Sequence, residues 1–342
     1  MTLPNEPLIE IRGLKTHFFT DEGVVRAVDG VDFDIYRNRT LCVVGESGCG
    51  KSITARSILQ IVDPPGRIVE GEIRFHRAVD NNGSARREVI DLAALPPHSR
   101  AMREIRGKDI AMIFQEPMTS LSPIHTVGDQ ITEAILLHLV VTKEEARERA
   151  IELLRRVGIP RPADRVDTYP FQLSGGMRQR VMIAMALACN PSLLIADEPT
   201  TAVDVTTQAQ ILELLLELQE EYGMGIMLIT HDLGVVAEMA DDVVVMYLGK
   251  VAERGDVDSI FHDPKHPYTQ ALLRSIPKLG VRRHEQRLDS IRGMVPDPLN
   301  RPDGCPFSTR CDEMIPGRCD RVVPPPVTVG AGREVRCVLY EE

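Results

Sequence analysis

The feature that most restricts the fold is the run Gly45–Ser52, which reads GESGCGKS and fits the pattern GxxxxGK(S/T). In such a loop the glycines let backbone N–H groups approach phosphate oxygens, the ammonium of Lys51 pairs with the outer phosphates, and the Ser52 hydroxyl suits Mg²⁺. Apolar residues 41–44 precede the loop, and a helical pattern follows it to about Val62. A chance match in such a chain is expected on the order of 0.01 times. We therefore predict a nucleotide-binding strand, loop and helix.

Further short apolar segments indicate the rest of the sheet. They are Ile110–Phe114, Leu193–Ala196 and Gly225–Thr230, and helical patterns separate them. Buried strands alternating with helices predict an α/β fold with a parallel sheet covered on both faces. One of the helices is expected at Glu145–Val157, because Thr142 and Glu145 form a capping-box pattern ahead of it.

Polar residues follow three of these predicted strands. Asp197 could hold Mg²⁺ through water, and Glu198 could orient and deprotonate an attacking water. Gln115 could coordinate Mg²⁺ without adding charge, and His231 would lie where ligands bind at the carboxyl end of a parallel sheet. In isolation, a solvated strand edge and a structural histidine explain these residues as well. Beside the phosphate loop, the functional interpretation is favoured.

A second anion-binding element is predicted at Leu173–Arg180, which reads LSGGMRQR. Ser174 and two glycines stand at the start of a helix expected at Met177–Cys189, and a helix N-terminus attracts anions. A capped helix after a glycine turn is the simpler local interpretation. One nucleotide does not need two such sites from one chain. The motif therefore favours a dimer in which it closes on the phosphates held by the partner.

The order of these motifs resembles that of the ABC ATPases over roughly residues 7–255. The resemblance implies an ABC-type P-loop NTPase core with a parallel sheet and a small irregular C-terminal extension. Residues 1–255 would form the nucleotide-binding domain, with a helical subdomain inserted at about 118–172. Residues 256–342 would form the extension.

The resemblance also implies a role for each matching residue. Glu198 is the general base, His231 the switch histidine, and Gln115 the link between nucleotide and helical subdomain. The ATP-binding residues are Phe18, which stacks on adenine, and Gly45, Ser47, Gly48, Cys49, Gly50, Lys51, Ser52 and Ile53. The Mg²⁺ ligands are Ser52, Gln115 and Asp197. The residues directed at the partner's ATP are Ser174, Gly175, Gly176 and Gln179, and Asp204 lies in the dimer contact.

Residues 266–269, which read HPYT, and the proline-rich tail resemble one branch, the oligopeptide, dipeptide and nickel importer ATPases. The segment 21–30 is similar to the D-type member of a D/F pair. The resemblance implies a motor that hydrolyses ATP to import peptides. Its partners would be a second ATPase (F-type, or a copy of this chain), two transmembrane permease subunits and an extracytoplasmic solute-binding protein. The chain would lie peripherally on the cytoplasmic face of the membrane. Nickel, opines and oligosaccharides are alternative solutes.

Four of the seven cysteines crowd the tail: Cys305, Cys311, Cys319 and Cys337. In a reducing cytosol such a group suggests metal more than disulfides. Their spacing is neither that of a zinc ribbon nor that of a bacterial ferredoxin, so zinc, an iron–sulfur cluster and inert thiols all stay open. Some members of the resembled family hold a [4Fe-4S] cluster on four tail cysteines, and the resemblance implies one here.

Composition bears on the alternatives. The net charge is −10, which disfavours a nucleic-acid partner. No apolar run approaches the roughly 20 residues that a bilayer requires, and no signal peptide is recognisable, so we expect a cytoplasmic chain. A soluble ABC ATPase of DNA repair or translation is the competing class, but such chains commonly carry two cassettes or basic arms. A regulator without turnover is disfavoured because Glu198 and His231 are both present.

Overall fold

The computed structural model describes residues 6–81, 84–115, 120–201, 203–276 and 291–341. The chain divides into two compact units, each assembled from separate segments. Unit 1 comprises Met1–Leu8, Ile35–Arg39 and Phe75–Leu228. Unit 2 comprises Ile9–Asp34, Thr40–Arg74 and Ile229–Glu342. Unit 2 therefore combines two segments of the N-terminal part, beginning at Ile9, with the C-terminal part from Ile229 onward.

Three adjacent strands form the sheet of unit 1. They are β6 (Ile110–Ile113), β7 (Leu193–Asp197) and β8 (Gly225–Ile229), in the order β8-β7-β6. β6 pairs parallel to β7, with Ile113 opposite Ala196. The predicted strands are confirmed with end shifts of one residue. Every residue of β7 and β8 is buried, as the apolar runs suggested.

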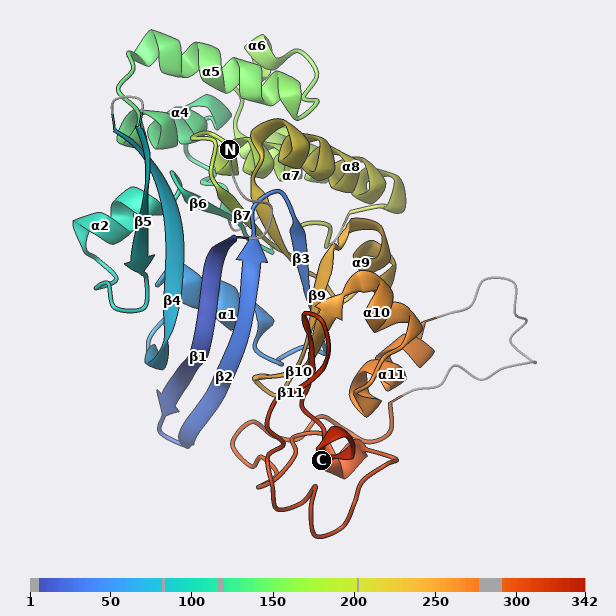
Figure 1. The fold of residues 1–342 in the computed structure, drawn as a ribbon. Coiled ribbons are helices and arrows are strands. Elements are labelled where there is room, and N and C mark those ends of the chain that lie inside the picture. The colour runs from blue at the N-terminus through green and yellow to red at the C-terminus, as the bar shows by residue number, and fades with distance from the viewer. Residues whose placement is uncertain (1–5, 82–83, 116–119, 202, 277–290, 342) are drawn as a thin grey trace, which may run out of the picture. The chain divides into compact units, whose positions relative to one another are not determined.

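Helices make up most of the rest of unit 1. Between β6 and β7, four of them pack against one another (Figure 1). The helix predicted after Thr142 is confirmed, with its capping box, and it begins at Lys143 rather than Glu145. The predicted start of the helical insert at about 118 lies outside the described residues. Among the residues of the unit that the structure describes, the helical elements are α2 (Arg100–Ile105), α4 (Val127–His138), α5 (Lys143–Arg156), α6 (Pro162–Arg165), η1 (Pro170–Gln172), α7 (Gly175–Ala186) and α8 (Val205–Tyr222).

Unit 2 contains a mixed sheet of five strands in the order β11-β12-β10-β9-β3. β3 runs parallel to β9, whereas the other neighbours are antiparallel. The strands are β3 (Thr40–Val44), β9 (Asp242–Tyr247), β10 (Lys250–Asp256), β11 (Val327–Gly330) and β12 (Arg333–Val335). The helices of the unit are α1 (Lys51–Ile58), α9 (Leu233–Met239), α10 (Val257–His262) and α11 (Pro267–Arg274).

A second set of long strands is formed by the N-terminal third of the chain. β1 (Pro7–Thr20) lies between β2 (Gly23–Tyr36) and β4 (Gly66–Asn81), and β5 (Ser84–Asp91) is the other neighbour of β4. β2, β1 and the first half of β4 belong almost entirely to unit 2, and β5 belongs to unit 1.

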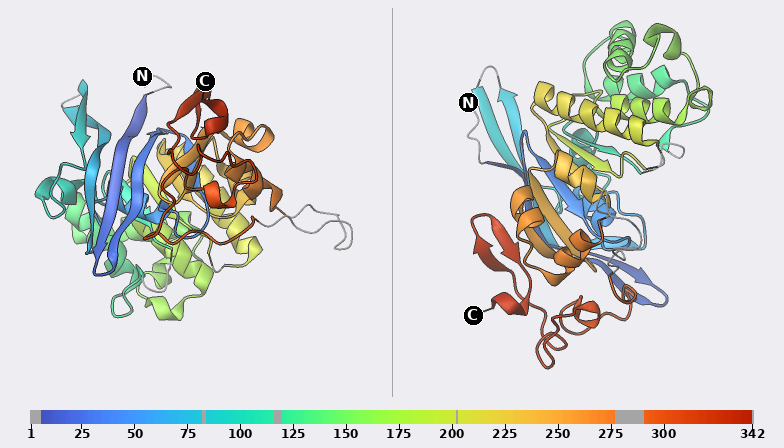
Figure 2. Two further views of the ribbon diagram at one scale, coloured as in Figure 1. Left: turned by 90° about the horizontal axis from the view of Figure 1, so that it is seen from below. Right: turned by 90° about the vertical axis from the view of Figure 1, so that its right-hand side faces the viewer.

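The C-terminal extension is more ordered than its prolines suggest. It opens with α10 and α11, and it closes with the hairpin β11–β12, which adds to β10 (Figure 2). The described residues 291–326 between them include the short turn η2 (Ser308–Arg310), and η3 (Val338–Tyr340) follows the hairpin. The sequence did not predict the hairpin, because the pairing of Glu253 with Val335 joins residues far apart in the chain.

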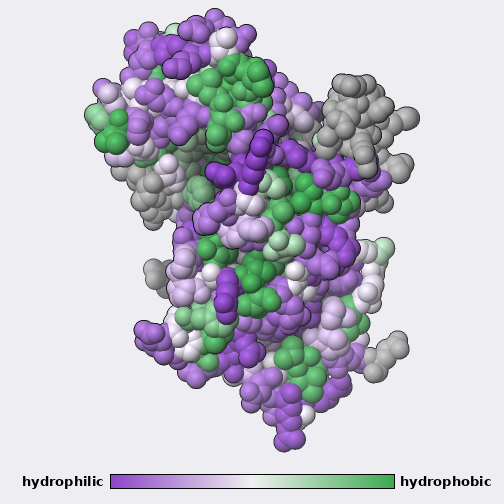
Figure 3. Space-filling model, turned by 90° about the vertical axis from the view of Figure 1, so that its left-hand side faces the viewer, coloured by the Kyte–Doolittle hydropathy of each residue, from purple (hydrophilic) through white to green (hydrophobic). Residues whose placement is uncertain are grey.

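The surface in Figure 3 carries separate hydrophobic patches among hydrophilic residues. Large hydrophobic side chains that are well exposed in unit 1 include Ile124, Leu137, Val140 and Phe171. In the part of the chain that the structure describes, no helix has both the length and the hydropathy needed to cross a membrane.

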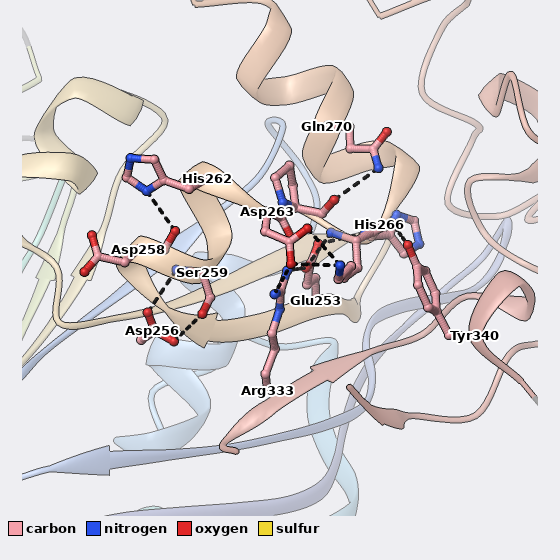
Figure 4. Close-up of polar contacts among 12 residues, drawn as sticks. Glu253, Asp256, Asp258, Ser259, His262, Asp263, His266, Gln270, Arg333 and Tyr340 are labelled. Carbon is pink, nitrogen blue, oxygen red and sulfur yellow. Dashed lines mark hydrogen bonds and ion pairs between the residues drawn. The ribbon is translucent and has the colours of Figure 1, made fainter. Parts of the chain in front are cut away.

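One buried carboxylate joins the hairpin to the segment between α10 and α11. Glu253 of β10 is fully buried and accepts hydrogen bonds from the backbone N–H groups of Lys265 and His266, each at 2.8 Å (Figure 4). The guanidinium of Arg333, on β12, donates to the same carboxylate at 3.0 Å. Because an unpaired buried charge is unfavourable, Arg333 is required for this carboxylate to stay buried.

We expect Arg333→Ala to destabilise the chain by about 3 kcal/mol, since it leaves Glu253 buried without its cation. The matched control is Glu334→Ala on the same strand, which removes a partly exposed pair with Arg254 at 2.7 Å. Such pairs contribute about 0–1 kcal/mol. Urea denaturation followed by circular dichroism would compare the two. Equal midpoints would show that the buried pair has no special role.

Candidate nucleotide site and C-terminal cysteine cluster

The predicted phosphate loop follows β3, and its shape depends on two glycines. Gly45 has φ 149°, and a Cβ atom there would lie 2.2 Å from the carbonyl oxygen of Met246. Gly50 has φ 104°, and a Cβ there would lie 2.3 Å from the carbonyl oxygen of Ala27. Neither position can hold a side chain without moving a neighbouring backbone segment, so both glycines are required for steric as well as conformational reasons.

The lysine of the loop is already directed into it. Lys51 is 6% exposed, and its Nζ donates to the carbonyl oxygens of Gly45 at 2.7 Å and Glu46 at 3.1 Å. Cys49 is buried beside it, and burial raises the pKa of the Cys49 thiol. Ser52 and Ile53 follow in the first turn of α1, whose N–H groups have no partners within the helix. Ser47 and Gly48 are exposed on the rim.

In unit 1, the ends of β6 and β7 bring two predicted residues together. Gln115 and Glu198 each lie two residues beyond the paired residues Ile113 and Ala196. The Gln115 amide nitrogen donates to Glu198 Oε2 at 2.9 Å. Its amide oxygen is thereby left as the atom suited to a cation. The adjacent Asp197, at the end of β7, is 3% exposed.

Glu198 is held by its backbone and by one residue that the sequence did not single out. Its φ of 48° lies in the left-handed region, which a non-glycine residue adopts at a cost of about 1–2 kcal/mol. The Thr201 hydroxyl donates to Glu198 Oε2 at 2.9 Å, so two donors share one carboxylate oxygen. Residues kept in such backbone conformations cluster at functional sites. The only signal for Thr201 was its place three residues after Glu198.

His231 and Phe18 both belong to unit 2, as does the phosphate loop. His231 is exposed and follows Thr230, whose backbone N–H bonds the carbonyl oxygen of Val43 at 3.4 Å. It therefore lies at the edge where β3 ends and the loop begins. Phe18 is half-buried and packs so closely on Gly66 that a Cβ there would lie 2.6 Å from its ring. The Arg67 guanidinium covers the ring of the neighbouring Phe19 at 4.3 Å.

The predicted anion-binding helix start is formed by α7. Ser174 is its N-cap, and its hydroxyl accepts the N–H of Met177 at 3.3 Å. Ser174 and Gly175 are exposed, and a Cβ on Gly176 would lie 3.0 Å from the Thr207 side chain. The helix begins two residues earlier than predicted, because the serine caps it directly.

Two other residues assigned to the partner's nucleotide or to the dimer have local roles in the structure. Gln179 is 2% exposed, so its side chain does not share the exposed position of Ser174. Asp204 is the N-cap of α8 and accepts the N–H of Thr207 at 2.9 Å. Hydrogen bonds from Thr207 lower the pKa of Asp204.

The four tail cysteines lie close enough to influence one another electrostatically. Burial first, and then the other three sulfurs, raise the pKa of Cys305 to about 12. Burial raises that of Cys311 to about 11, and Cys337 shifts in the same direction. All seven cysteines are free thiols. Within the described residues, no group of three or more His, Cys, Asp or Glu side chains has the geometry of a metal site.

Backbone N–H groups nevertheless act on all four sulfurs. The N–H of Ile315 donates to Cys319 Sγ at 3.3 Å. At the other three sulfurs, the backbone N–H of the residue two places after the cysteine lowers the thiol pKa, against the larger effect of burial. These residues are Phe307 for Cys305, Glu313 for Cys311, and Leu339 for Cys337. Such bonds favour the thiolate form, which is the form that ligates metals.

Comparisons with known proteins agree with this arrangement. The family model described as "ABC transporter" matches residues 28–201, and the model described as "Oligopeptide/dipeptide transporter, C-terminal region" matches residues 252–319. Among solved structures, the dimeric bacterial ABC transporter cassette MJ0796 superposes with a TM-score of 0.61 at 28% identity. That match covers 73% of this chain and 98% of the cassette.

Two curated relatives are similar over almost their whole length. The oligopeptide transport ATP-binding protein AppD of Bacillus subtilis is 50% identical, covering 98% of this chain and 97% of the relative. The dipeptide transport ATP-binding protein DppD of Escherichia coli is 48% identical, covering 96% of each chain. The chain therefore belongs to the ABC transporter ATPases, in the branch that carries the oligopeptide/dipeptide transporter C-terminal region.

Proposed function

We propose that this chain is the ATP-hydrolysing subunit of a membrane importer for peptides. The observation that carries the proposal is the near full-length similarity to relatives named for oligopeptide and dipeptide transport, C-terminal region included. Nickel, opines and oligosaccharides remain the alternative solutes, because the solute is selected by other subunits.

The contacts of the described residues support a separate role for each site residue in ATP hydrolysis. Glu198 acts as the general base, since its carboxylate is fixed by Gln115 and Thr201. Lys51, Ser52 and the loop N–H groups hold the phosphates, and His231 contacts the terminal phosphate. Mg²⁺, when bound by Ser52, Gln115 and Asp197, supplies charge neutralisation at the phosphates; these side chains offer the oxygen ligands that it prefers. Phe18 is the proposed adenine contact.

We expect Glu198→Gln to lower ATP turnover by at least about 100-fold, because it removes the proton acceptor. Nucleotide affinity should change little, since the amide keeps the size and the contact with Thr201. A coupled ATPase assay and a fluorescent-nucleotide titration would measure the two effects. Lys51→Ala serves as the comparison and should lose affinity. Turnover above a tenth of the wild-type rate in Glu198→Gln would exclude Glu198 as the base.

The proposed complex contains two ATPases, two transmembrane permease subunits and an extracytoplasmic solute-binding protein, with this chain at the cytoplasmic face. The second ATPase is either an F-type subunit or a copy of this chain. In a dimer, the exposed Ser174 and Gly175 would face the partner's nucleotide, together with the half-buried Gly176. Asp204 would lie in the dimer contact; it bonds Thr207, whose side chain packs against Gly176. The exposed side chains of Leu137 and Val140 on and after α4 are suited to receiving a permease helix.

Purification of the tagged chain from native membranes in mild detergent should bring the permeases, the second ATPase and the binding protein with it. We expect Leu137→Asp to reduce capture of the permeases at least about tenfold, because it puts a charge on a 74% exposed apolar contact. Val89→Asp, at a 56% exposed position of the same unit, is the matched control. Recovery of ribosomes or nucleic acid in place of permeases would favour the DNA-repair or translation class.

For the cysteine cluster we propose a [4Fe-4S] cluster on Cys305, Cys311, Cys319 and Cys337. Four thiolates are the ligand set that such a cluster takes. The Ile315 N–H donates to Cys319 Sγ, and neighbouring backbone N–H groups act to lower the pKa of the other three thiols. A bound cluster would join three separate parts of the extension. The proposed role is structural.

Protein purified without oxygen should contain about four iron and four sulfide per chain. Cys311→Ser should lose most of this iron, whereas the control Cys189→Ser, at a thiol outside the group, should keep it. Iron and sulfide analysis with visible absorption provides the measurement. Stoichiometric zinc would point to a Cys₄ zinc site, and metal-free protein to inert thiols.

A further inference from the structure

Two contacts from the C-terminal region converge on one residue of the phosphate loop, Glu46. The backbone N–H of Glu46 donates to the Tyr268 hydroxyl at 2.9 Å. The Glu46 carboxylate is held by both terminal nitrogens of Arg310, with Nη1–Oε2 at 2.6 Å and Nη2–Oε1 at 3.1 Å. The loop is thus joined to residues more than 200 positions later in the chain.

Contacts other than the one with Glu46 also hold the Arg310 side chain in place. Its side chain is 4% exposed, its Nε donates to the Arg292 carbonyl oxygen at 2.9 Å, and its Nη1 also donates to the Tyr247 hydroxyl at 3.2 Å. Its guanidinium lies 5.8 Å from the ring centre of Tyr247. A buried arginine with this many partners has little freedom to move, so the Glu46 carboxylate is bound by a preorganised fork.

The surroundings of Tyr268 are equally rigid. Its ring contacts those of Tyr247 and Phe307, at centroid distances of 4.7 and 5.3 Å. Its backbone N–H donates to His266 Nδ1 at 3.0 Å, and His266 bonds Glu253 through its own N–H (Figure 4). Burial lowers the pKa of His266 to about 4, so it stays neutral. The Tyr268 hydroxyl that accepts from the loop therefore belongs to the segment that Glu253 holds in place.

Besides joining the C-terminal region to the phosphate loop, Arg310 has an electrostatic role. Glu46 is an anionic residue inside a loop predicted to bind a polyphosphate, and like charges a few ångströms apart repel. Arg310 neutralises that charge. The carbonyl oxygen of Glu46 also accepts from Lys51, so the position of Glu46 affects the cation on which phosphate binding depends.

We propose that Arg310 is a positioning residue for nucleotide binding: it neutralises and holds Glu46, so that the C-terminal region preforms the phosphate loop. This inference rests on the proposed use of ATP. It makes nucleotide affinity depend on a part of the chain that contributes no residue to the predicted ATP site.

The test compares full-length Arg310→Gln, Glu46→Gln and the double variant in a fluorescent-nucleotide titration. We expect Arg310→Gln to weaken affinity about tenfold, because Glu46 is left as an unpaired anion, and the loss should shrink at high salt. Adding Glu46→Gln should restore affinity to within about threefold of wild type, since the repulsion is gone. The matched control is Arg318→Gln, which breaks a tail pair with Glu341 and should leave affinity unchanged.

The outcomes distinguish this proposal from a purely structural contact between Arg310 and Glu46, and from the proposed function. Unchanged affinity in Arg310→Gln, or a double variant no better than the single, would overturn it. Should Arg310→Gln fail to fold, Glu46→Gln alone decides: affinity at or above the wild-type value supports the proposal, and a tenfold loss contradicts it. If the wild-type chain binds nucleotide and Lys51→Ala does not, the proposed function stands whatever Arg310 does.

Discussion

The geometry of unit 2 depends on two places where backbone meets backbone with no room for a side chain. Gly45 lies against Met246 of β9, and Gly50 lies against Ala27 of β2. The two ends of the phosphate loop therefore pack tightly against two strands that lie far apart in the sequence. Because its two ends cannot shift without moving these strands, the loop has little freedom to change shape. Preorganisation of this kind reduces the ordering cost that binding would otherwise meet.

In unit 1 the corresponding constraint is the register of two parallel strands. Pairing of Ile113 with Ala196 fixes the places where β6 and β7 end, and hence the meeting of Gln115 with Glu198. The left-handed backbone at Glu198 then turns its carboxylate towards Thr201. Register, rather than any local preference of the two residues, accounts for their contact.

Much of this could be predicted, because the signals are local. The apolar run of β3, the capping box of α5 and the carboxylates after β7 each lie within a few residues of what they determine. The sequence did not predict Thr201, the burial of Gln179 or the hairpin β11–β12. The contact of Thr201 follows from the left-handed backbone at Glu198, which the local sequence does not indicate. The hairpin depends on pairing with the distant β10, and its strands have only three and four residues within a proline-rich tail. Phe18 shows the same limit, since its packing on Gly66 could not be deduced from two adjacent phenylalanines.

Glu46 occupies a position that the loop pattern leaves open, so a motif search passes over it. Its importance appears only when Arg310 and Tyr268 are seen to reach it. A carboxylate beside a phosphate site repels the phosphates unless a cation neutralises it. A partly buried carboxylate without a partner is also unfavourable in itself. The loop and the C-terminal region therefore constrain each other: a change to either charge leaves the other unpaired. Arg310 directly precedes Cys311, so the residue that holds the loop is adjacent in sequence to the cysteine group.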